Sequence, residues 1–297
     1  MMKFKLKVPA TSANLGPGFD FLGVGLDIYN EYLFEENKDN QIKLVGFSVE
    51  VSDNYVLKGY KAVFEYLNLP TPSVTITEVK RDIPVARGMG SSSAALACGI
   101  IAGNKMAGNK LSNAERDRLA VKLEGHPDNI IPCLHGDLVT TVVNDNELII
   151  EKLEVRSDLS FILFIPKYKV KTIEARNALP KSYSLSDVTS NASRVILMPK
   201  AFLDGDIEVL KKIMVDKVHE PYRLKLIKEY DIIKNALKDE YCTFNISGSG
   251  PTMISITNRK NEEKIKKIVE DLHLDIDILI TSRGFGASII EWKMNFI

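Results

Sequence analysis

The chain has 297 residues, of which 45% are hydrophobic and 26% are charged, with 39 basic against 39 acidic side chains. This composition is typical of a folded globular protein and excludes a disordered, collagen-like or coiled-coil chain. Because the formal net charge is zero, there is no basic footprint for nucleic acid, and we expect no nucleic-acid partner.

The sequence also lacks signals for membrane insertion and for disulfide bonds. The longest weakly polar stretch, residues 94–103, is too short to span a bilayer, and residues 1–16 lack the apolar block of a signal peptide. The 3 cysteines have no paired spacing, which argues against a disulfide framework or a zinc knuckle. The sequence thus predicts no membrane association and a reducing, cytoplasmic compartment.

The first half of the chain opens on a strand and returns repeatedly to strand patterns. Lys3–Val8 alternates apolar side chains with lysines, as a half-buried strand does. Ser112, with Glu115 three residues later, resembles a capping box at the start of a helix that stops at residues 124–129. Similar patterns predict helices over 55–67 and 113–123, and strands over 29–35, 42–51, 73–79, 137–143 and 148–155.

Two glycine-rich segments interrupt these patterns. Gly16, Gly18, Gly23 and Gly25 crowd the segment after the first strand, which predicts a long, shaped turn over residues 10–25. The second segment, Gly-Met-Gly-Ser-Ser-Ser at residues 88–93, precedes an alanine-rich run almost free of charge. We therefore expect a buried helix whose N-terminus lies inside the protein or at a cleft.

The second half mixes helices with paired strands. It begins with a continuous apolar strand over 161–165, which reads as buried. Further patterns predict helices over 172–179, 186–203, 207–215, 224–237 and 261–274, and strands over 243–247, 252–257, 276–281 and 287–292. This order predicts the α+β class, with one domain over residues 1–156 and a second over 157–297.

The segment 88–93 does not match the common phosphate-binding motifs. The chain holds no G-x-x-x-x-G-K-[ST], and neither residues 16–18 nor residues 88–90 have the third glycine and βαβ context of a dinucleotide site. Glycines nevertheless let a backbone approach an anion, a helix N-terminus favours a phosphate, and a serine hydroxyl suits Mg²⁺. Serines that only cap the helix are the simpler alternative. Because the helix must be buried, we prefer the phosphate interpretation.

A hydrolase is the second interpretation of the same segment. Residues 90–94 nearly match a G-x-S-x-G nucleophile elbow, which needs a strand directly before it and a histidine later in the chain. Here a proline-containing loop precedes the serines, and both His219 and His273 fall on charged helical patterns. These features disfavour a hydrolase.

Several segments together resemble the motifs of the GHMP family of small-molecule kinases, and most closely those of its homoserine kinase branch. The first motif corresponds to residues 9–20, the phosphate loop to residues 88–92 and the third motif to residues 246–251. Residues 124–129, with the sequence Glu-Gly-His-Pro-Asp-Asn, and residues 216–223 add further matches. The resemblance therefore covers essentially the whole chain.

This resemblance implies a fold and a reaction. The fold has an N-terminal domain like those of ribosomal proteins, a ferredoxin-like C-terminal domain and an active site between them. The reaction moves the γ-phosphoryl group of ATP, with Mg²⁺, to the side-chain hydroxyl of L-homoserine in threonine biosynthesis. Departures are modest, since Met89 replaces the usual Leu, Ser93 the usual Ala and Asp137 a common Gly. The extra serine leaves open which of Ser91, Ser92 and Ser93 ligates Mg²⁺.

The resemblance also implies catalytic and nucleotide-binding residues. Asn129 is expected to hydrogen-bond the reacting hydroxyl, and Glu124 with Ser92 to hold Mg²⁺. On the residues alone, Glu124 is equally a solvated helix end and Asn54 an N-cap. We expect catalysis by alignment and charge neutralisation, because no carboxylate in these motifs is placed as a general base. ATP is expected to contact Asn54, Pro84, Val85, Ala86, Arg87, Gly88, Met89, Gly90, Ser91, Ser92, Ser93 and Ala94.

Homoserine carries a carboxylate and an ammonium, so its site needs both cations and an anion. The resemblance assigns the carboxylate to Arg176 and Arg223, whose planar guanidinium groups give a two-pronged fit, and the ammonium to Asp20. Without the resemblance, a solvated surface charge is the better interpretation of each arginine, and Asp20 is an ordinary turn residue. The other expected contacts are Asn14, His126, Thr172 and Gly248.

Two other functions stay open at this point. A sibling kinase for mevalonate or shikimate would not need both Asp20 and two arginines. A non-catalytic sensor of the same fold would not need a metal site. The sequence also leaves open whether the protein forms a homodimer.

Overall fold

A computed structural model describes residues 1–48, 53–144 and 147–290 of the protein. The strands are β1 Lys3–Ala13, β2 Leu22–Glu36, β3 Lys43–Val45, β4 Val74–Arg81, β5 Leu138–Asn144, β6 Glu147–Leu153, β7 Leu159–Pro166, β8 Asn245–Ile246, β9 Met253–Asn258, β10 Ile276–Thr281 and β11 Ser288–Ile290. The helices are α1 Tyr55–Tyr66, α2 Ser91–Met106, α3 Asn113–Glu124, α4 Pro127–His135, α5 Thr172–Asn177, α6 Leu185–Val195, α7 Met198–Asp204, α8 Ile207–Ile213, α9 Glu220–Arg223, α10 Tyr230–Leu237 and α11 Glu262–Glu270.

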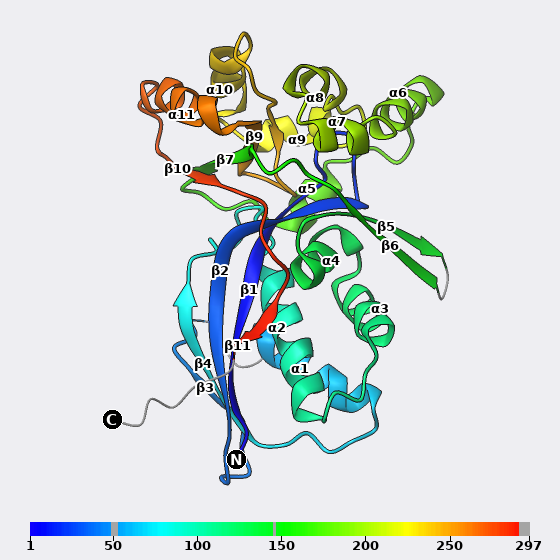
Figure 1. The fold of residues 1–297 in the computed structure, drawn as a ribbon, viewed down its shortest axis with the longest axis vertical. Helices are drawn as coiled ribbons and strands as arrows, with labels where there is room; N and C mark the ends of the chain where they lie inside the picture. The colour runs from blue at the N-terminus through cyan, green and yellow to red at the C-terminus, as the bar shows by residue number, and fades with distance from the viewer. Residues whose placement is uncertain (49–52, 145–146, 291–297) are drawn as a thin grey trace.

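The first sheet is built on two long strands, β1 and β2, which pair antiparallel along their length. Along β2, Asn30–Glu36 pairs with β4, whereas Leu22–Val24 pairs with β5. β3 lies beyond β4, β6 lies beyond β5, and β11 covers the outer edge of β1. Helices α1 to α4 gather on one side of this sheet, in the lower part of Figure 1.

The alternating pattern at the start of the chain correctly predicts β1. Phe4, Leu6 and Val8 are buried in the core, while the intervening lysines are partly exposed at the sheet surface. The strand continues to Ala13, beyond the predicted end, and pairs with β2 across a register shift between Pro9 and Ala10. This extension brings the residues that follow Pro9 to the centre of the molecule.

The predicted turn over residues 10–25 is wrong at both ends, because β1 continues to Ala13 and β2 already begins at Leu22. A Cβ on Gly23 would lie 1.9 Å from the carbonyl oxygen of Asp128, and one on Gly25 would lie 3.2 Å from that of Pro132. These glycines therefore allow α4 to pack closely on β2. That contact holds the start of α4 against the centre of the sheet.

Helix α4 is absent from the sequence prediction, which reads residues 124–129 as the end of a helix and leaves the next residues unassigned. Gly125 ends α3 with a φ of +93°, and Pro127 occupies the first turn of α4, where its missing N–H costs no hydrogen bond. His126 consequently lies between two helices and is the residue before α4. The junction of α3 and α4 is thus a defined corner and not a loose loop.

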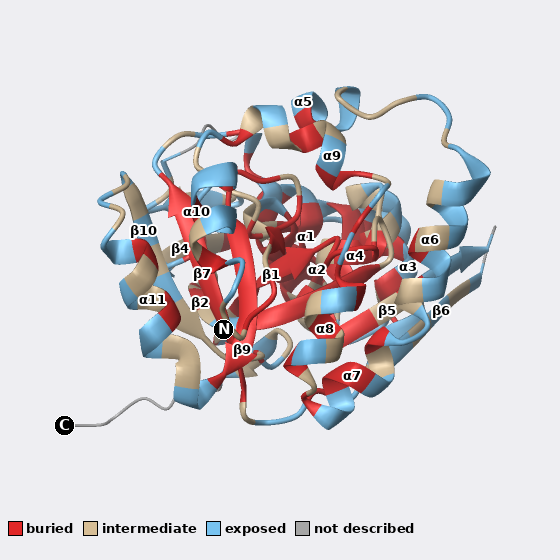
Figure 2. Ribbon diagram, turned by 90° about the horizontal axis from the view of Figure 1, so that it is seen from above, coloured by how far each residue is buried: buried red, intermediate tan, exposed pale blue. Residues whose placement is uncertain are grey.

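The second sheet has the antiparallel order β10-β7-β9-β8, with β7 near its centre. Side chains of β7 alternate between two cores. Phe161 and Leu163 join the large core with α7 and α8, whereas Ile162 and Phe164 join a smaller core with α10 and α11. This double burial explains the continuous apolar sequence that predicts the strand. Figure 2 shows the buried strands inside, with exposed outer faces on α6, α8 and α11.

Several predicted boundaries are wrong in detail. The helix predicted over 186–203 is two helices, α6 and α7, with Pro199 in the first turn of α7. The helix predicted over 224–237 is divided into a 3₁₀ turn, Leu224–Leu226, and α10, and is preceded by the short α9. The strand predicted over 42–51 is confirmed only at β3, and residues 49–51 lie outside the described part.

The last strand connects the two ends of the chain. β11 pairs with β1 in the first sheet, although residues 291–292 of the predicted strand lie outside the described part. The proposed domain boundary at residue 156 stays a prediction. The mixture of helices with sheets that are antiparallel, apart from the β3–β4 pair, confirms the α+β class. Every helix in the described ranges is too short or too polar to cross a bilayer.

Candidate active site

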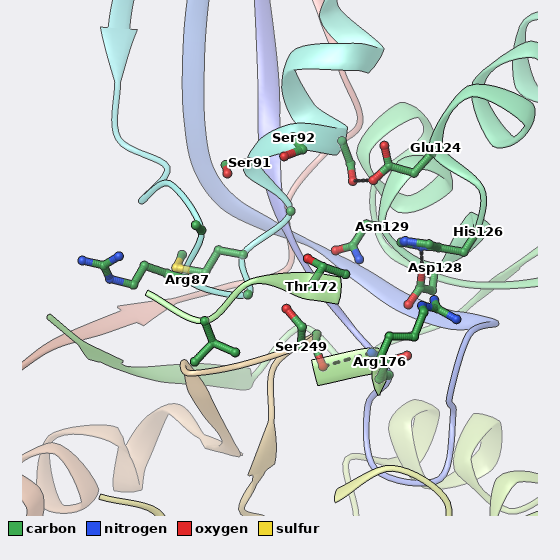
Figure 3. A pocket seen from close by; sticks show the side chains of 18 of the residues that line it. Arg87, Ser91, Ser92, Glu124, His126, Asp128, Asn129, Thr172, Arg176 and Ser249 are labelled. Carbon is green, nitrogen blue, oxygen red and sulfur yellow. Dashed lines mark hydrogen bonds and ion pairs between the residues drawn. The ribbon is translucent and has the colours of Figure 1, made fainter. Parts of the chain in front are cut away.

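A cleft of about 280 Å³ opens between the N-terminus of α2, the corner of α3 and α4, helix α5 and the loop after β8 (Figure 3). It brings together segments more than a hundred residues apart in the chain. The predicted site residues that line it are Asn14, Ala86, Arg87, Gly88, Met89, Gly90, Ser91, Ser92, Ser93, Glu124, His126, Asn129, Thr172, Arg176, Arg223 and Gly248.

A second cleft of about 430 Å³ adjoins the first through Tyr55, Ser91 and Ser92. Asn54 and Val85 line this second cleft, together with the aromatic side chains of Tyr32 and Phe47. Asn54 is buried, and its Oδ1 accepts a hydrogen bond from the Leu57 N–H, so it also caps α1. An apolar cleft beside a polar one suits a nucleotide, which has a flat base and a charged tail.

Three predicted site residues line neither cleft: Pro84, Ala94 and Asp20. Ala94 is fully buried, and its N–H donates to the Gly90 carbonyl within the first turn of α2. The structure therefore gives no direct access to this residue. Pro84 lies in the segment that leads into the glycine-rich loop. Asp20 lies next to the cleft and contacts a residue that lines it.

The glycine-rich loop presents the N-terminus of α2 to the first cleft. Gly88 and Gly90 have φ values of +75° and +66°, and Gly90 precedes the helix without any side-chain cap. No side chain therefore caps the N-terminus of α2, and the first turn of the helix carries no acidic side chain. Free N–H groups at the start of a buried helix form an anion site.

Arg87 fixes this loop to the second sheet and is not a free charge. Its Nε donates to the Pro166 carbonyl at 2.9 Å, and its Nη2 donates to the Lys167 carbonyl. The loop is thus held at the end of β7. The anion site and the second sheet are joined by this side chain and by two further hydrogen bonds. The Ser247 hydroxyl donates to the Gly88 carbonyl at 2.7 Å, and the Thr252 N–H donates to the Arg87 carbonyl at 3.2 Å.

Thr11 is a site residue that the sequence prediction did not single out, although it lies in the first motif. Its hydroxyl donates to Asn129 Oδ1 at 2.8 Å, and its N–H donates to the Met89 carbonyl at 3.2 Å. A Cβ on Gly90 would lie 1.9 Å from Thr11 Oγ1 and 3.0 Å from Asn129 Oδ1. Glycine at position 90 therefore makes room for the Thr11–Asn129 pair, and that pair orients the Asn129 amide.

The serine that contacts Glu124 is Ser93, and not the predicted Ser92. The Ser93 hydroxyl donates to Glu124 Oε1, and Ser93 is almost fully buried, whereas Ser92 is exposed at the cleft. Burial raises the pKa of Glu124, and the Ser93 hydrogen bond opposes that rise. Figure 3 shows Ser92 and Glu124 in the upper part of the view.

The oxygen donors around Glu124 fit Mg²⁺. The set consists of one carboxylate and neighbouring serine hydroxyls, which are the hard ligands that this ion takes. No group of three or more His, Cys, Asp or Glu side chains among the described residues could hold a metal ion alone. A cation here would therefore share its remaining positions between water and the oxygens of a bound nucleotide.

His126 and Asp128 form a second polar pair at the corner of α3 and α4. Nδ1 of His126 lies 2.5 Å from Asp128 Oδ1, and Asp128 is almost fully buried. Burial by itself lowers the pKa of His126, but the hydrogen bond and charge of Asp128, with the charge of Glu124, raise it overall. Asp128, which lay in a matched motif but was not predicted as a site residue, is the group that holds His126.

The predicted carboxylate-binding arginines differ in their surroundings. Arg176 is exposed on α5, four residues after Thr172, and forms an ion pair with Asp20. Arg223 is only 2% exposed. Burial lowers the pKa of Arg223, with a further contribution from the nearby charge of Arg176. Both guanidinium groups lie over the Phe19 ring, at 5.8 and 5.1 Å from its centre.

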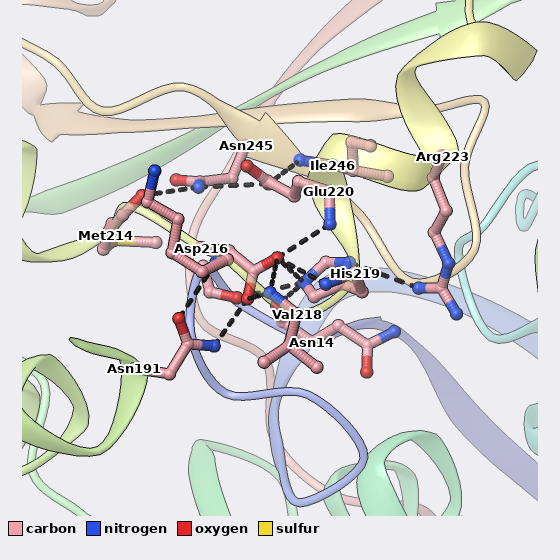
Figure 4. A network of polar contacts seen from close by, with 12 residues as sticks. Asn14, Asn191, Met214, Asp216, Val218, His219, Glu220, Arg223, Asn245 and Ile246 are labelled. Carbon is pink, nitrogen blue, oxygen red and sulfur yellow. Dashed lines mark hydrogen bonds and ion pairs between the residues drawn. The ribbon is translucent and has the colours of Figure 1, made fainter. Parts of the chain in front are cut away.

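A buried polar network behind Arg223 completes the site (Figure 4). The carboxylate of Asp216 accepts hydrogen bonds from the N–H groups of Val218, His219 and Glu220, and from the Asn191 amide at 2.7 Å. It therefore fixes the turn that begins α9. Asn191, Asp216, Val218, His219 and Glu220 are not in the predicted set of site residues. The match over residues 216–223 pointed to all of them except Asn191.

The chain is similar to known proteins over most of its length. Models of the GHMP kinase N-terminal and C-terminal domains match residues 54–137 and 198–273. A homoserine kinase from Clostridium beijerinckii is 38% identical over 293 residues, covering 96% of this chain and 98% of that protein. Another from Crocosphaera subtropica is 34% identical over 295 residues, covering 96% of each. The crystal structure of homoserine kinase from Cytophaga hutchinsonii has a TM-score of 0.85 at 28% identity, covering 97% of both chains.

Proposed function

Since the chain belongs to the GHMP kinase family, we propose that it transfers the γ-phosphoryl group of ATP to the side-chain hydroxyl of L-homoserine. The product is O-phospho-L-homoserine, an intermediate of threonine biosynthesis. The observation that carries the choice of acceptor is the charged set at one end of the cleft. Asp20, Arg176 and Arg223 supply one anion and two cations, which match the ammonium and the carboxylate of an amino acid.

The other end of the cleft suits ATP, the phosphoryl donor. The uncapped N-terminus of α2 and the loop N–H groups would hold the phosphates, and the apolar second cleft would hold the base. When bound, Mg²⁺ would neutralise phosphate charge, with Glu124 and the adjacent serines as its protein ligands. Ser92 stays the predicted ligand, because the Ser93 hydroxyl already serves the Glu124 carboxylate.

Asn129 lies where ATP and the acceptor hydroxyl would meet. Because the Thr11 hydroxyl donates to Asn129 Oδ1, the Nδ2 group is left to donate to the reacting hydroxyl oxygen. Phosphoryl transfer passes through a loose transition state, for which alignment and charge neutralisation supply most of the catalysis. The chain is thus expected to orient the hydroxyl without removing its proton through a strong base.

The test is a coupled assay of ADP release with homoserine, shikimate and mevalonate as acceptors, with and without Mg²⁺. Activity with homoserine alone supports the proposal. Preference for shikimate or mevalonate would assign the protein to a sibling kinase. ATP binding without turnover on any acceptor would instead favour a ligand sensor.

A further inference from the structure

Four residues close a ring of hydrogen bonds behind the amino-acid end of the cleft. Figure 4 labels three of them, Asn14, His219 and Arg223. His219 Nε2 lies 3.1 Å from the Asn14 carbonyl oxygen, and Asn14 Nδ2 donates to the Gly248 carbonyl at 3.0 Å. Arg223 Nη1 donates to the same Gly248 carbonyl at 3.0 Å and lies 3.3 Å from His219 Nδ1. The ring therefore joins the first glycine-rich loop, the loop after β8 and helix α9.

The partners of His219 determine its protonation state. Nε2 faces two carbonyl oxygens, those of Asn14 and Gly16 at 3.1 and 3.0 Å, so this nitrogen must carry a hydrogen. Nδ1 faces the Arg223 guanidinium, which can only donate, so Nδ1 must be an acceptor. The two requirements together select the neutral Nε2–H tautomer, and no other state satisfies both sides.

The surroundings of His219 favour that neutral form. The side chain is fully buried, and its ring stacks on Phe19 with 5.3 Å between ring centres. The charged groups around it are Asp216, 3.8 Å from Nε2, and Arg223. Burial is the largest influence and lowers the pKa of His219; Arg223 lowers it further, while Asp216 opposes both.

Arg223 in turn has one end occupied and one end available. Its Nε donates to the Ala175 carbonyl at 3.3 Å, and its Nη1 is shared between His219 and Gly248. Nη2 donates no hydrogen bond to any residue in the described ranges, and Arg223 lines the cleft. A buried guanidinium held by three fixed acceptors is pre-organised for an anion at its remaining corner.

We propose that His219 is a positioning residue, which uses its neutral imidazole to hold both the loop of residues 14–16 and the Arg223 guanidinium for the substrate carboxylate. This inference rests on the proposed function, since the carboxylate is that of homoserine. His219 itself does not reach the reacting atoms. It acts through Arg223, so its loss changes the binding of the amino acid and not the transfer step.

Two substitutions separate the parts of this role. His219→Phe keeps the ring stacked on Phe19 but removes both nitrogen contacts. His219→Asn places an oxygen near the former Nδ1 and so keeps an acceptor for Arg223. A buried, charged donor that loses its acceptor costs about 10- to 100-fold in affinity. We expect His219→Phe to raise the KM for homoserine by about this factor, with the KM for ATP and kcat within about twofold.

The asparagine variant is the rescue. We expect it to leave the KM for homoserine within about fivefold of that of the parent protein, because only the contact to the loop carbonyls is lost. The matched control is His273→Asn. It replaces an exposed histidine that follows α11 and has a φ of +53°, and it should change neither KM. Equal KM values in the asparagine and phenylalanine variants, or equal losses for ATP and homoserine, would overturn the proposal.

Nitrogen-15 NMR of the ligand-free protein provides a readout that is independent of activity. The protein contains 4 histidines, and the signal of His219 is identified by its absence in the His219→Asn variant. We expect a neutral Nε2–H ring at pH 7. A protonated ring, or the Nδ1–H tautomer, would refute the inference even if homoserine is the substrate. An Nε2–H ring in a protein without homoserine kinase activity would refute the proposed function alone.

Discussion

The guanidinium of Arg176 and the carboxylate of Asp20 form a two-pronged ion pair beside the cleft, with N–O distances of 2.9 and 2.8 Å. Asp20 has a φ of +65°, and its N–H is held by Asn14 Oδ1 at 2.9 Å, so the carboxylate is presented from a fixed turn. The side chains assigned to the ammonium and to the carboxylate of the amino acid thus neutralise each other in this structure. A zwitterion can take the place of each partner, whereas a simple anion must compete with Asp20 for Arg176.

This pairing predicts a preference for zwitterions. 4-Hydroxybutyrate lacks the ammonium, and 3-aminopropanol lacks the carboxylate, so each should bind at least about 10-fold more weakly than homoserine. The Asp20→Asn variant should bind homoserine more weakly than the parent does. It should bind 4-hydroxybutyrate at least as well as the parent, because Arg176 no longer pairs with a carboxylate. Competition experiments against homoserine measure these affinities. A parallel loss for both ligands in Asp20→Asn would contradict a contact between Asp20 and the ammonium.

Replacing Arg176 or Arg223 with lysine should weaken the binding of homoserine. Arg176→Lys and Arg223→Lys keep the charge but lose the planar fork, so the KM for homoserine should rise by about one to two decades while that for ATP changes little. The buried Arg223 should show the larger effect, because lysine cannot satisfy the carbonyls of Ala175 and Gly248 together with His219. Separate KM measurements for the two substrates check this. Unchanged values for both would remove the arginines from the site.

The phosphate loop depends on the absence of a side chain at position 90. Gly90→Ala would place a Cβ 1.9 Å from Thr11 Oγ1 at a φ of +66°, so we expect a loss of ATP affinity of more than about tenfold and a displaced Asn129. Calorimetric titration with ATP measures the first effect. Gly108→Ala is the matched control, because it has a φ of +79° but nothing within 4 Å. If both variants behave alike, backbone strain and not the Thr11 contact explains the loss.

The sequence predicted most elements because their patterns report local burial. β1 alternates because one of its faces packs on the core, and residues 161–165 of β7 are all apolar because both faces of that strand are buried. The Ser112–Glu115 capping box is present as predicted. Helix α4 escaped prediction because Pro127 and Pro132 are breakers by propensity, whereas tertiary packing on the glycines of β2 stabilises the helix.

The residues of the candidate site could be predicted only because several motifs together resemble those of a known family. Spacing could not reveal that Ser93 contacts Glu124, since all three serines begin the same helix and only its rotation in the core decides which one is buried. Nor could it reveal the ring through His219 and Gly248, whose members come from three distant segments. Asp137 adopts a φ of +58°, which accounts for glycine as its common alternative.

The serines should differ in their effect on the Mg²⁺ requirement. Glu124→Ala and Ser92→Ala should raise the Mg²⁺ concentration for half-maximal activity, and added Mg²⁺ should partly restore turnover. Ser93→Ala removes a hydrogen bond to Glu124 and not a predicted ligand, so its shift should be smaller and greatest at low pH, where Glu124 is more readily protonated. Mg²⁺ titrations at saturating ATP distinguish the three. A larger shift for Ser93→Ala than for Ser92→Ala would make Ser93 the ligand.

Glu220 should make the stability of the protein depend on pH. Burial raises its pKa to about 7, although the Ile246 N–H, at 2.7 Å from Oε1, opposes that rise. In the unfolded chain the carboxyl loses its proton near its ordinary value of 4.5. Between these values the folded state keeps a proton that the unfolded state releases, so the free energy of unfolding falls as pH rises and levels off above about 7.

Glu220→Gln removes this titration but keeps an oxygen that can accept from the Ile246 N–H. Relative to the parent, the variant should gain stability progressively as pH rises from 4.5 to about 7, by on the order of 3 kcal/mol at pH 8.5. Urea unfolding of both proteins at pH 5.0 and 8.5 measures the difference, and the other carboxyl groups cancel because they are common to both. A difference in unfolding free energy that is the same at the two pH values would mean that Glu220 is ionised in the folded protein throughout. The Ile246 N–H would then be held by a buried charge, and the loop that carries Gly248 would owe its position to that charge and not to a neutral hydrogen bond.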